Sequence, residues 1–303
     1  MAFILALTHF TSLLWPPLLA LFPGPVALAL ASVLSFFHFS ASLVLFYSQP
    51  GMRRKFSRVA WHLPLALLIL LGGCMALWPV GFARWLIFFF VFLFWHYAKQ
   101  SYGFFVLSFR GEPRMEDPNS FERQGVLLYF LAAALFGFLS TQTSGGTMLA
   151  FGIYIPTLNL PAAPVLWTGR IACALGLGYC GWICFRYRRW VPLCTALSFY
   201  LWVDLSLWNY QLLFLLPAFH ALQYLPIVGR RVLSQSLPVR LRWLAAGAAL
   251  TCAMYFLFRA HPVAGVGVLG FLGVLEIAMN FHHYFIDAYI WRFRDPGIRA
   301  EMN

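Results

Sequence analysis

Charged residues are scarce in this chain, and acidic residues are the scarcest of them. Of the 303 residues, 10% are charged; 21 are Lys or Arg and only 9 are Asp or Glu. Soluble domains carry about 25% charged residues, so this scarcity excludes an ordinary soluble domain. The 62% hydrophobic content and the mean hydropathy of +0.77 instead predict an all-α integral membrane protein.

C-x-x-C pairs are absent, although the chain has six cysteines. All of them lie in apolar stretches: Cys74, Cys173, Cys180, Cys184, Cys194 and Cys252. This placement is typical of small buried hydrophobic residues and argues against a disulfide framework or a cysteine-ligated zinc site. The chain also lacks internal repeats and low-complexity tracts. We therefore expect residues 1–303 to form a single transmembrane domain.

The net charge of +12 does not indicate nucleic-acid binding, because the basic residues lie in short clusters between apolar runs. Five clusters hold most of them, at 53–58, 110–123, 186–189, 230–242 and 292–299. Each successive pair of clusters encloses two apolar spans, so all five clusters lie on one side. By the positive-inside rule that side is the cytoplasm, with both termini there. The expected partner is the lipid bilayer, and the expected location is a bacterial inner (cell) membrane.

Apolar windows of about 20 residues predict a polytopic bundle of about ten transmembrane helices. The first window, 3–22, is interrupted by Pro16 and Pro17. The windows are 3–22, 26–48, 61–79, 83–107, 124–140, 162–185, 191–208, 210–228, 242–259 and 264–291. Turn signals rich in Pro and Gly separate several of them.

Four of these helices carry histidine at about the same depth. The positions are His38, His96, His220 and the pair His282–His283, each 9 to 15 residues before a basic cluster. At about 1.5 Å per residue, this places them roughly 14–22 Å from the clusters. An ionisable side chain at that depth usually faces the bundle interior and marks a functional site. His9, His62 and His261 lie nearer span ends or loops, where a wetted or structural imidazole is expected.

Polar residues at helical spacing accompany these histidines. In the last span Glu276, Asn280, His283 and Asp287 recur every three or four residues and so share one face. In the fourth span Gln100 follows His96 by one turn.

Together these residues predict a metal site, because neutral imidazole suits Fe, Cu, Zn and Ni. The expected ligands are His38, His96, His220 and one or both of His282 and His283. Asp287, Glu276 and Gln100 are candidate catalytic residues that orient ligands or bound water, and Asp204 is a further carboxylate at this depth. The expected metal is Fe(II), with another transition metal as the alternative, and the expected substrate is a hydrophobic small molecule.

The order of these histidines resembles that of the Brp/Blh family of integral-membrane β-carotene dioxygenases. The similarity covers most of the chain: His38 in an early helix, the pair His96-Tyr97 after 58 residues, His220 in a late helix, and His282 followed by Asp287 before a basic end. The resemblance implies a histidine-bound ferrous iron that cleaves an isoprenoid. The chain departs from the family pattern at Ser42, at Lys99–Gln100 and at Tyr224, where the family has a carboxylate, an Asp and a second histidine. These departures leave open another lipid-like substrate, or loss of the chemistry.

Other functions remain open at this point. The intramembrane His, Asp and Glu residues also suit an ion- or proton-coupled transporter, although inverted repeats are lacking. The pair His282–His283 suggests a fatty-acid desaturase or hydroxylase, although the H-x3-H and H-x2-H-H boxes of those enzymes are missing. A metal-free structural subunit and a bis-histidine haem protein are the remaining alternatives.

Overall fold

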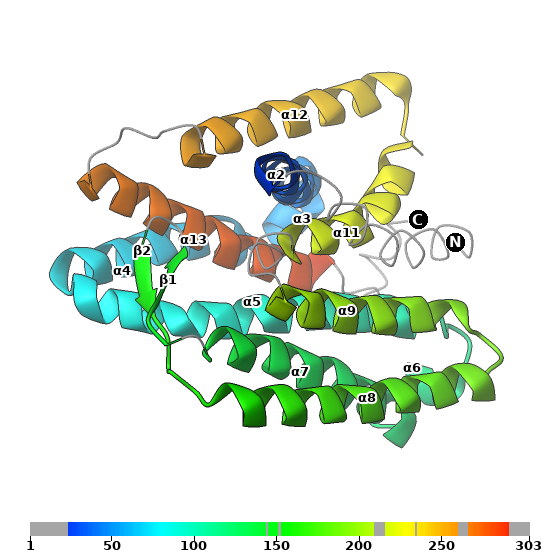
Figure 1. Cartoon of the computed structure of the whole chain (residues 1–303). Coiled ribbons are helices and arrows are strands. Elements are labelled where there is room, and N and C mark those ends of the chain that lie inside the picture. Colours follow the sequence, from blue (N-terminus) through cyan, green and yellow to red (C-terminus); the bar gives the residue numbers. More distant parts are fainter. Residues whose placement is uncertain are drawn as a thin grey trace. The chain divides into compact units, whose positions relative to one another are not determined.

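The computed structural model describes residues 24–143, 145–150, 153–208, 216–233, 235–259 and 266–290. These residues are mainly helical (Figure 1), in agreement with the predicted class. The elements are α2 (Gly24–Ser48), α3 (Pro50–Lys55), η1 (Arg58–His62), α4 (Leu63–Leu77), α5 (Pro79–Leu107), α6 (Pro113–Glu116), α7 (Phe121–Thr141), β1 (Thr147–Ala150), β2 (Ile153–Pro156), α8 (Ala162–Arg186), α9 (Val191–Trp208), α11 (Leu216–Leu233), α12 (Leu237–Arg259) and α13 (Val266–Ile290). The two short strands pair with each other between the predicted apolar windows 124–140 and 162–185.

The chain forms two compact units. Among the described residues, the first contains those up to Ala31, together with those in Ile87–Thr147 and Thr157–Ile227. The second contains the described residues of Ser32–Leu86 and Met148–Pro156 and those between Val228 and Ile290. The long helices α2, α5 and α11 each contribute residues to both units.

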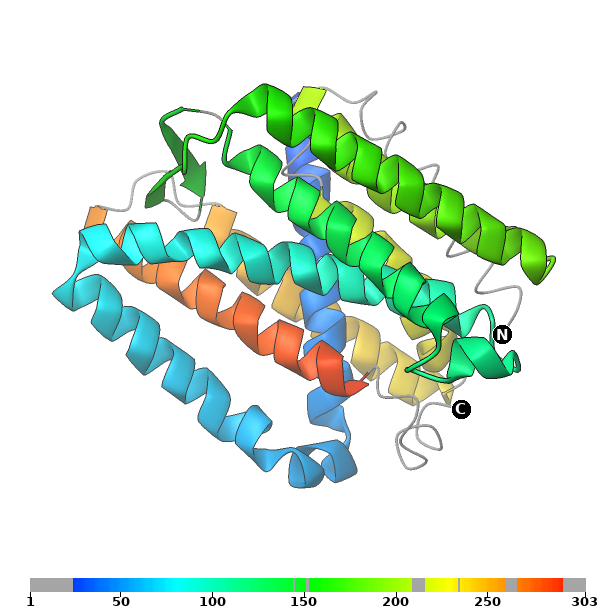
Figure 2. The same ribbon diagram turned by 90° about the horizontal axis from the view of Figure 1, so that it is seen from below.

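In the first unit α7 and α8 pack along their length, with α9 against both (Figures 1 and 2). Glycine permits the close approach of α7 and α8. A Cβ atom at Gly169 would lie 2.0 Å from the ring of Phe136, and one at Gly176 would lie 2.5 Å from the ring of Tyr129. Small residues serve this purpose in membrane helices, whose association depends on close van der Waals packing.

In the second unit α13 packs against α4, and Figure 2 shows the two helices running side by side. The helix containing α4 begins with a π-helical turn, η1, in which the N–H of Leu63 donates to the carbonyl of Arg58. Pro64 follows and has no N–H. It therefore cannot donate to the carbonyl of Ala60 in an α pattern, or to that of Val59 in a π pattern. Side chains from other helices reach both carbonyls, as described below.

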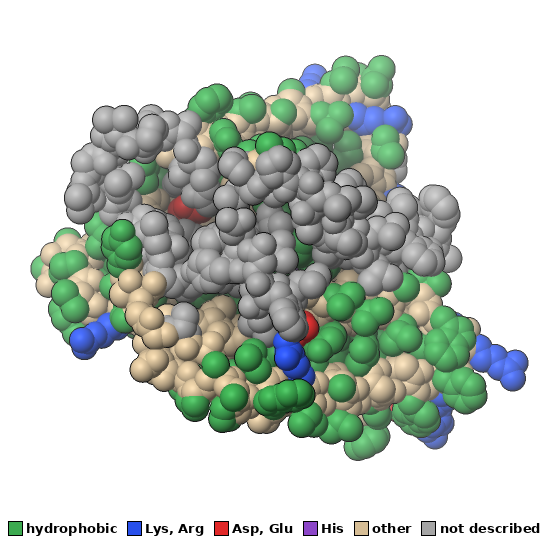
Figure 3. All heavy atoms as spheres, viewed as in Figure 1, with side chains coloured by type: hydrophobic (Ala, Val, Ile, Leu, Met, Phe, Trp, Pro, Cys, Tyr) green, Lys and Arg blue, Asp and Glu red, His purple; other side chains and the backbone are tan. Residues whose placement is uncertain are grey.

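Four helices within the described residues are long and apolar enough to cross a membrane: Ala29–Ser48, Arg58–Leu77, Pro79–Leu107 and Phe121–Thr141. Large hydrophobic side chains are exposed on α4 and α8, and Figure 3 shows them along α8. The exposed residues on α8 include Trp167, Ile171, Leu175, Trp182 and Phe185. The predicted total of about ten spans and the cytoplasmic termini stay predictions, and window 3–22 lies outside the described residues.

Candidate metal centre

Three buried ligand-type side chains meet within the second unit, one on α2 and two on α13. Nε2 of His38 lies 3.7 Å from Oδ2 of Asp287, and Nε2 of His283 lies 3.4 Å from the same oxygen. The two imidazole rings are edge to face, with centroids 4.6 Å apart. One ligand atom from each of the three residues lies within 4.8 Å of the others. All three residues are at most 1% exposed.

The helices account for this convergence. His283 and Asp287 are four residues apart on α13, which places both on one face. Two ligands that are each about 2.1 Å from a metal and at right angles to one another are separated by about 3 Å. The observed separations of 3.4 and 3.7 Å are slightly wider than this. The three atoms thus form a group that a metal ion could draw together by a few tenths of an ångström.

His282 lies on another face of α13 and contacts a different part of the unit. Its Nε2 is 3.1 Å from the carbonyl oxygen of Val59 and 3.3 Å from the hydroxyl of Tyr47. That hydroxyl donates its own hydrogen to the carbonyl of Ala60 at 2.6 Å. We therefore assign the proton to Nε2 of His282, because both of its contacts are acceptors. His282 and Tyr47 thus reach the two carbonyls to which Pro64 cannot donate.

A second histidine group lies within the first unit, between α5 and α11. Nε2 of His96 is 3.0 Å from Nε2 of His220, and both residues are at most 5% exposed. Tyr97 packs on the ring of His220 with centroids 4.5 Å apart. A direct hydrogen bond needs a proton on one Nε2 and none on the other, whereas binding of one metal by both atoms needs neither to carry a proton. The separation of 3.0 Å fits both arrangements.

The buried amide side chains of Gln100 and Gln223 lie next to this second group. Nε2 of Gln100 donates to the backbone carbonyl of His220 at 2.9 Å and lies 3.5 Å from Oε1 of Gln223. The hydroxyl of Ser101 donates to the same Oε1 at 3.1 Å. Gln100, which was expected to orient ligands or water, therefore fixes α5 against the histidine-bearing turn of α11.

Two carboxylates proposed from the sequence lie apart from these groups. Glu276 is buried but precedes His283 by seven residues on α13, roughly 10 Å along the helix axis. Asp204 on α9 accepts from Nε of Arg170 on α8 at 2.8 Å, and both side chains are partly exposed. Among the described residues, Asp287 is the carboxylate that lies with histidines. His9 and His261 lie outside the described residues.

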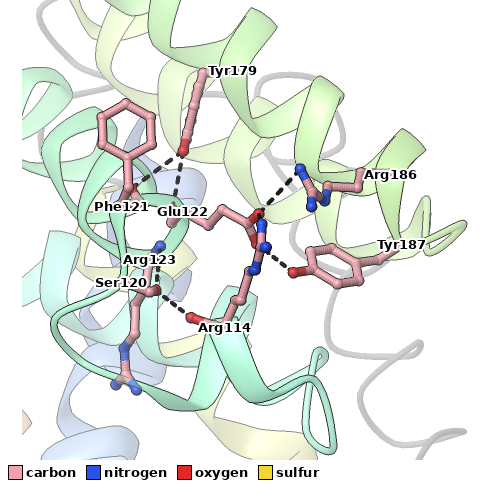
Figure 4. Close-up of polar contacts among 8 residues, drawn as sticks. All are labelled: Arg114, Ser120, Phe121, Glu122, Arg123, Tyr179, Arg186 and Tyr187. Carbon is pink, nitrogen blue, oxygen red and sulfur yellow. Dashed lines mark hydrogen bonds and ion pairs between the residues drawn. The ribbon is translucent and has the colours of Figure 1, made fainter.

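A further polar cluster in the first unit was not anticipated from the sequence. Figure 4 shows buried Glu122 of α7 between Arg114, Arg186 and the hydroxyl of Tyr187. The guanidinium nitrogens of Arg114 and Arg186 are 3.2 and 3.3 Å from Oε1. Burial of Tyr187, with its hydrogen bond to Glu122, raises the pKa of this phenol from 10.0 to about 12. The cluster joins α6, α7 and α8 at one end of the unit.

Sequence spacing alone could not reveal the partners of His282 and Glu122, since they come from distant segments. Pro64 was the one local signal for the first of these contacts, because a proline early in a helix leaves carbonyls in need of donors.

Comparison with known proteins adds no assignment: no family model matches the chain, and neither a curated protein nor a solved structure is detectably similar.

Proposed function

We propose that this chain is a membrane-embedded metal oxygenase or related oxidoreductase that acts on an apolar, lipid-like or isoprenoid substrate. The observation that carries the proposal is the buried set of two imidazoles and one carboxylate, His38, His283 and Asp287. A set of two histidines and one carboxylate with open positions is typical of non-haem Fe(II) oxygenases. The proposed location is a bacterial inner membrane, in keeping with four apolar helices of spanning length.

The chemistry of the donor atoms supports iron. Two imidazole nitrogens and one carboxylate oxygen suit Fe(II), whereas a thiolate-rich set would select copper(I) or zinc. Of the two adjacent histidines, we assign His283 as the ligand. His283 lies with Asp287 and His38, whereas the ring of His282 contacts the carbonyl of Val59 and the hydroxyl of Tyr47.

We further propose that His96 and His220 bind the same ion. This step rests on the sequence, which predicts that all four histidines lie at about the same depth in the bundle. It also agrees with their Nε2 separation of 3.0 Å, the spacing of neighbouring ligands around one metal. The alternative is a hydrogen-bonded histidine pair that supports α5 and α11.

The residues of the chain have separate tasks in this proposal. His38, His283 and Asp287 hold the metal, which when bound supplies a Lewis acid and a redox centre for dioxygen. Gln100 positions His220 through its backbone carbonyl. Phe39, whose ring centroid lies 4.5 Å from that of His283, covers one side of the ligand with an apolar surface.

Metal analysis of the purified protein tests the proposal. We expect close to one iron per chain, and loss of at least about 90% of it in His38→Ala and in Asp287→Ala, because second-sphere changes alone cost 10- to 100-fold in metal affinity. His96→Ala and His220→Ala should also lose metal. Retention of metal in these two variants would identify their contact as a hydrogen bond.

Two results would contradict the proposed function. The first is a purified protein without near-stoichiometric transition metal, and the second is a haem absorption spectrum. Substrate flux in metal-free liposomes would favour the transporter. The pairing of Asp204 with Arg170 counts against a proton relay that needs this carboxylate.

A further inference from the structure

The amide groups of Gln100 and Gln223 lie side by side in the first unit, one helical turn from the histidine pair. Gln100 is 8% exposed and Gln223 is fully buried. Each has one polar atom that makes no hydrogen bond to the residues that the structure describes: Oε1 of Gln100, an acceptor, and Nε2 of Gln223, a donor. Buried polar groups nearly always have a partner, so these two atoms indicate a ligand.

One face of α5 leads from the surface to this amide pair. His96, Gln100 and Gly103 are at offsets of 0, 4 and 7 residues, and so share that face. Gly103 is exposed, and a Cβ atom built there meets no described atom within 4 Å. The face therefore passes from an open position at Gly103, through Gln100, to His96.

The two atoms together define the chemistry of the ligand. A hydroxyl group satisfies both, because it donates to Oε1 of Gln100 and accepts from Nε2 of Gln223. A ketone or ether would leave Gln100 without a donor, and an ammonium group would leave Gln223 without an acceptor. A carboxylate would meet the Gln100 oxygen without a compensating charge, since Lys99 is exposed and lies over the ring of Tyr102, at 5.4 Å.

We propose that Gln100 and Gln223 bind the hydroxyl group of an apolar alcohol. This inference rests on the proposed oxygenase function and names its substrate class: a long-chain or isoprenoid alcohol. Gln100 follows His96 by four residues, and Gln223 follows His220 by three, so the hydroxyl lies about 4.5–6 Å along the helices from the histidines. The reacting carbons are therefore those close to the hydroxyl end.

Photolabelling of the metal-free protein tests this inference separately from the metal chemistry. The probe is a long-chain primary alcohol with a diazirine near its hydroxyl, and the comparison is the diazirine alkane without the hydroxyl. After chelator treatment, the alcohol should label peptides of α5 and α11 around Gln100 and Gln223 about tenfold more than the alkane. A factor of ten corresponds to about one hydrogen bond of the net strength found in proteins.

The variant Gln100→Met/Gln223→Met should abolish this preference for the alcohol. Gln124→Met is the matched control, because Gln124 also donates to a backbone carbonyl, that of Pro118, but on the surface of α7; it should label as the wild type does. Equal labelling by alcohol and alkane in the wild type would overturn the inference, and so would labelling of peptides elsewhere in the chain. An absence of labelling would also overturn it, because that result is expected if water alone fills the site. If the protein as purified contains no iron but its chelated form is labelled by the alcohol, the alcohol site stands and the oxygenase is rejected. If it contains iron but its chelated form is not labelled, the oxygenase stands and the alcohol site is rejected.

Discussion

His282 and His283 are neighbours on α13, and their side chains leave the helix about 100° apart. One imidazole donates to the carbonyl of Val59, and the other lies against Asp287. The two adjacent histidines of α13 therefore have different contacts and do not act as one unit. The sequence predicted both as candidates, but only the three-dimensional contacts separate their tasks.

This separation gives a paired test on adjacent residues. His283→Ala should lose at least about 90% of the bound metal, as expected for removal of a ligand. His282→Ala should keep the metal and lower the free energy of unfolding by about 0.5–1.5 kcal/mol, the net contribution of a hydrogen bond, because the partly buried carbonyl of Val59 loses its donor. Metal content and chemical unfolding of both variants measure this. Equal metal loss in the two variants would refute the assignment.

The raised pKa of the Tyr187 phenol predicts that the stability of the protein depends on pH in the alkaline range. Its pKa is raised by burial and by its hydrogen bond to Glu122, from 10.0 to about 12. Because the folded pKa is the higher one, this contribution to stability is complete below pH 10 and is lost as the pH rises toward 12. Tyr187→Phe should therefore lose less stability than the wild type between pH 10 and 12. Parallel thermal unfolding of the two proteins checks this, and identical pH profiles would contradict it.

At the scale of helices, glycine decides how closely α7 and α8 approach. Gly169 and Gly178 are both on α8, but a Cβ atom at Gly169 would overlap Phe136 whereas one at Gly178 meets nothing within 4 Å. The two positions therefore form a matched pair in one helix. Their difference arises from packing alone, because the helical propensity of the new residue is the same.

We expect Gly169→Ala to destabilise the protein by about 1–3 kcal/mol, the usual cost of overpacking. Gly178→Ala should be neutral or stabilising by up to about 1 kcal/mol, because alanine favours helix more than glycine does. Unfolding in denaturant measures both changes. Similar destabilisation by the two substitutions would show that the contact with Phe136 does not limit the packing.

The helices were largely predictable, and the contacts between them were not. Hydropathy and turn signals predicted α4 and α7 closely, because long apolar runs between Pro, Gly and charged residues leave few alternatives. The pairing of β1 with β2 was missed, since two four-residue strands leave too weak a pattern. For the site, spacing on α13 predicted that His283 and Asp287 share a face. The approach of His38 to both depends on packing between helices, which periodicity does not encode.

At the scale of the whole molecule, a buried metal would couple binding to stability. A ligand that binds only the folded state stabilises it by about 2.7 kcal/mol at a hundredfold excess over Kd. Fe(II) should therefore raise the unfolding midpoint of the wild type, and a chelator should reverse the shift. Asp287→Ala should respond to neither. A wild-type midpoint that does not change with iron would contradict a metal centre within the fold.

The turn before Pro64 has a consequence for the order in which the centre forms. Tyr47 reaches this turn from α2, the helix of His38, and His282 reaches it from α13, the helix of His283. The turn in which this proline lacks an N–H thus contacts both helices that carry the proposed ligands. If the proposed site binds a metal, the ion would meet side chains whose helices are already held together, so part of their conformational freedom would already be lost. Such preorganisation strengthens binding by reducing its entropic cost.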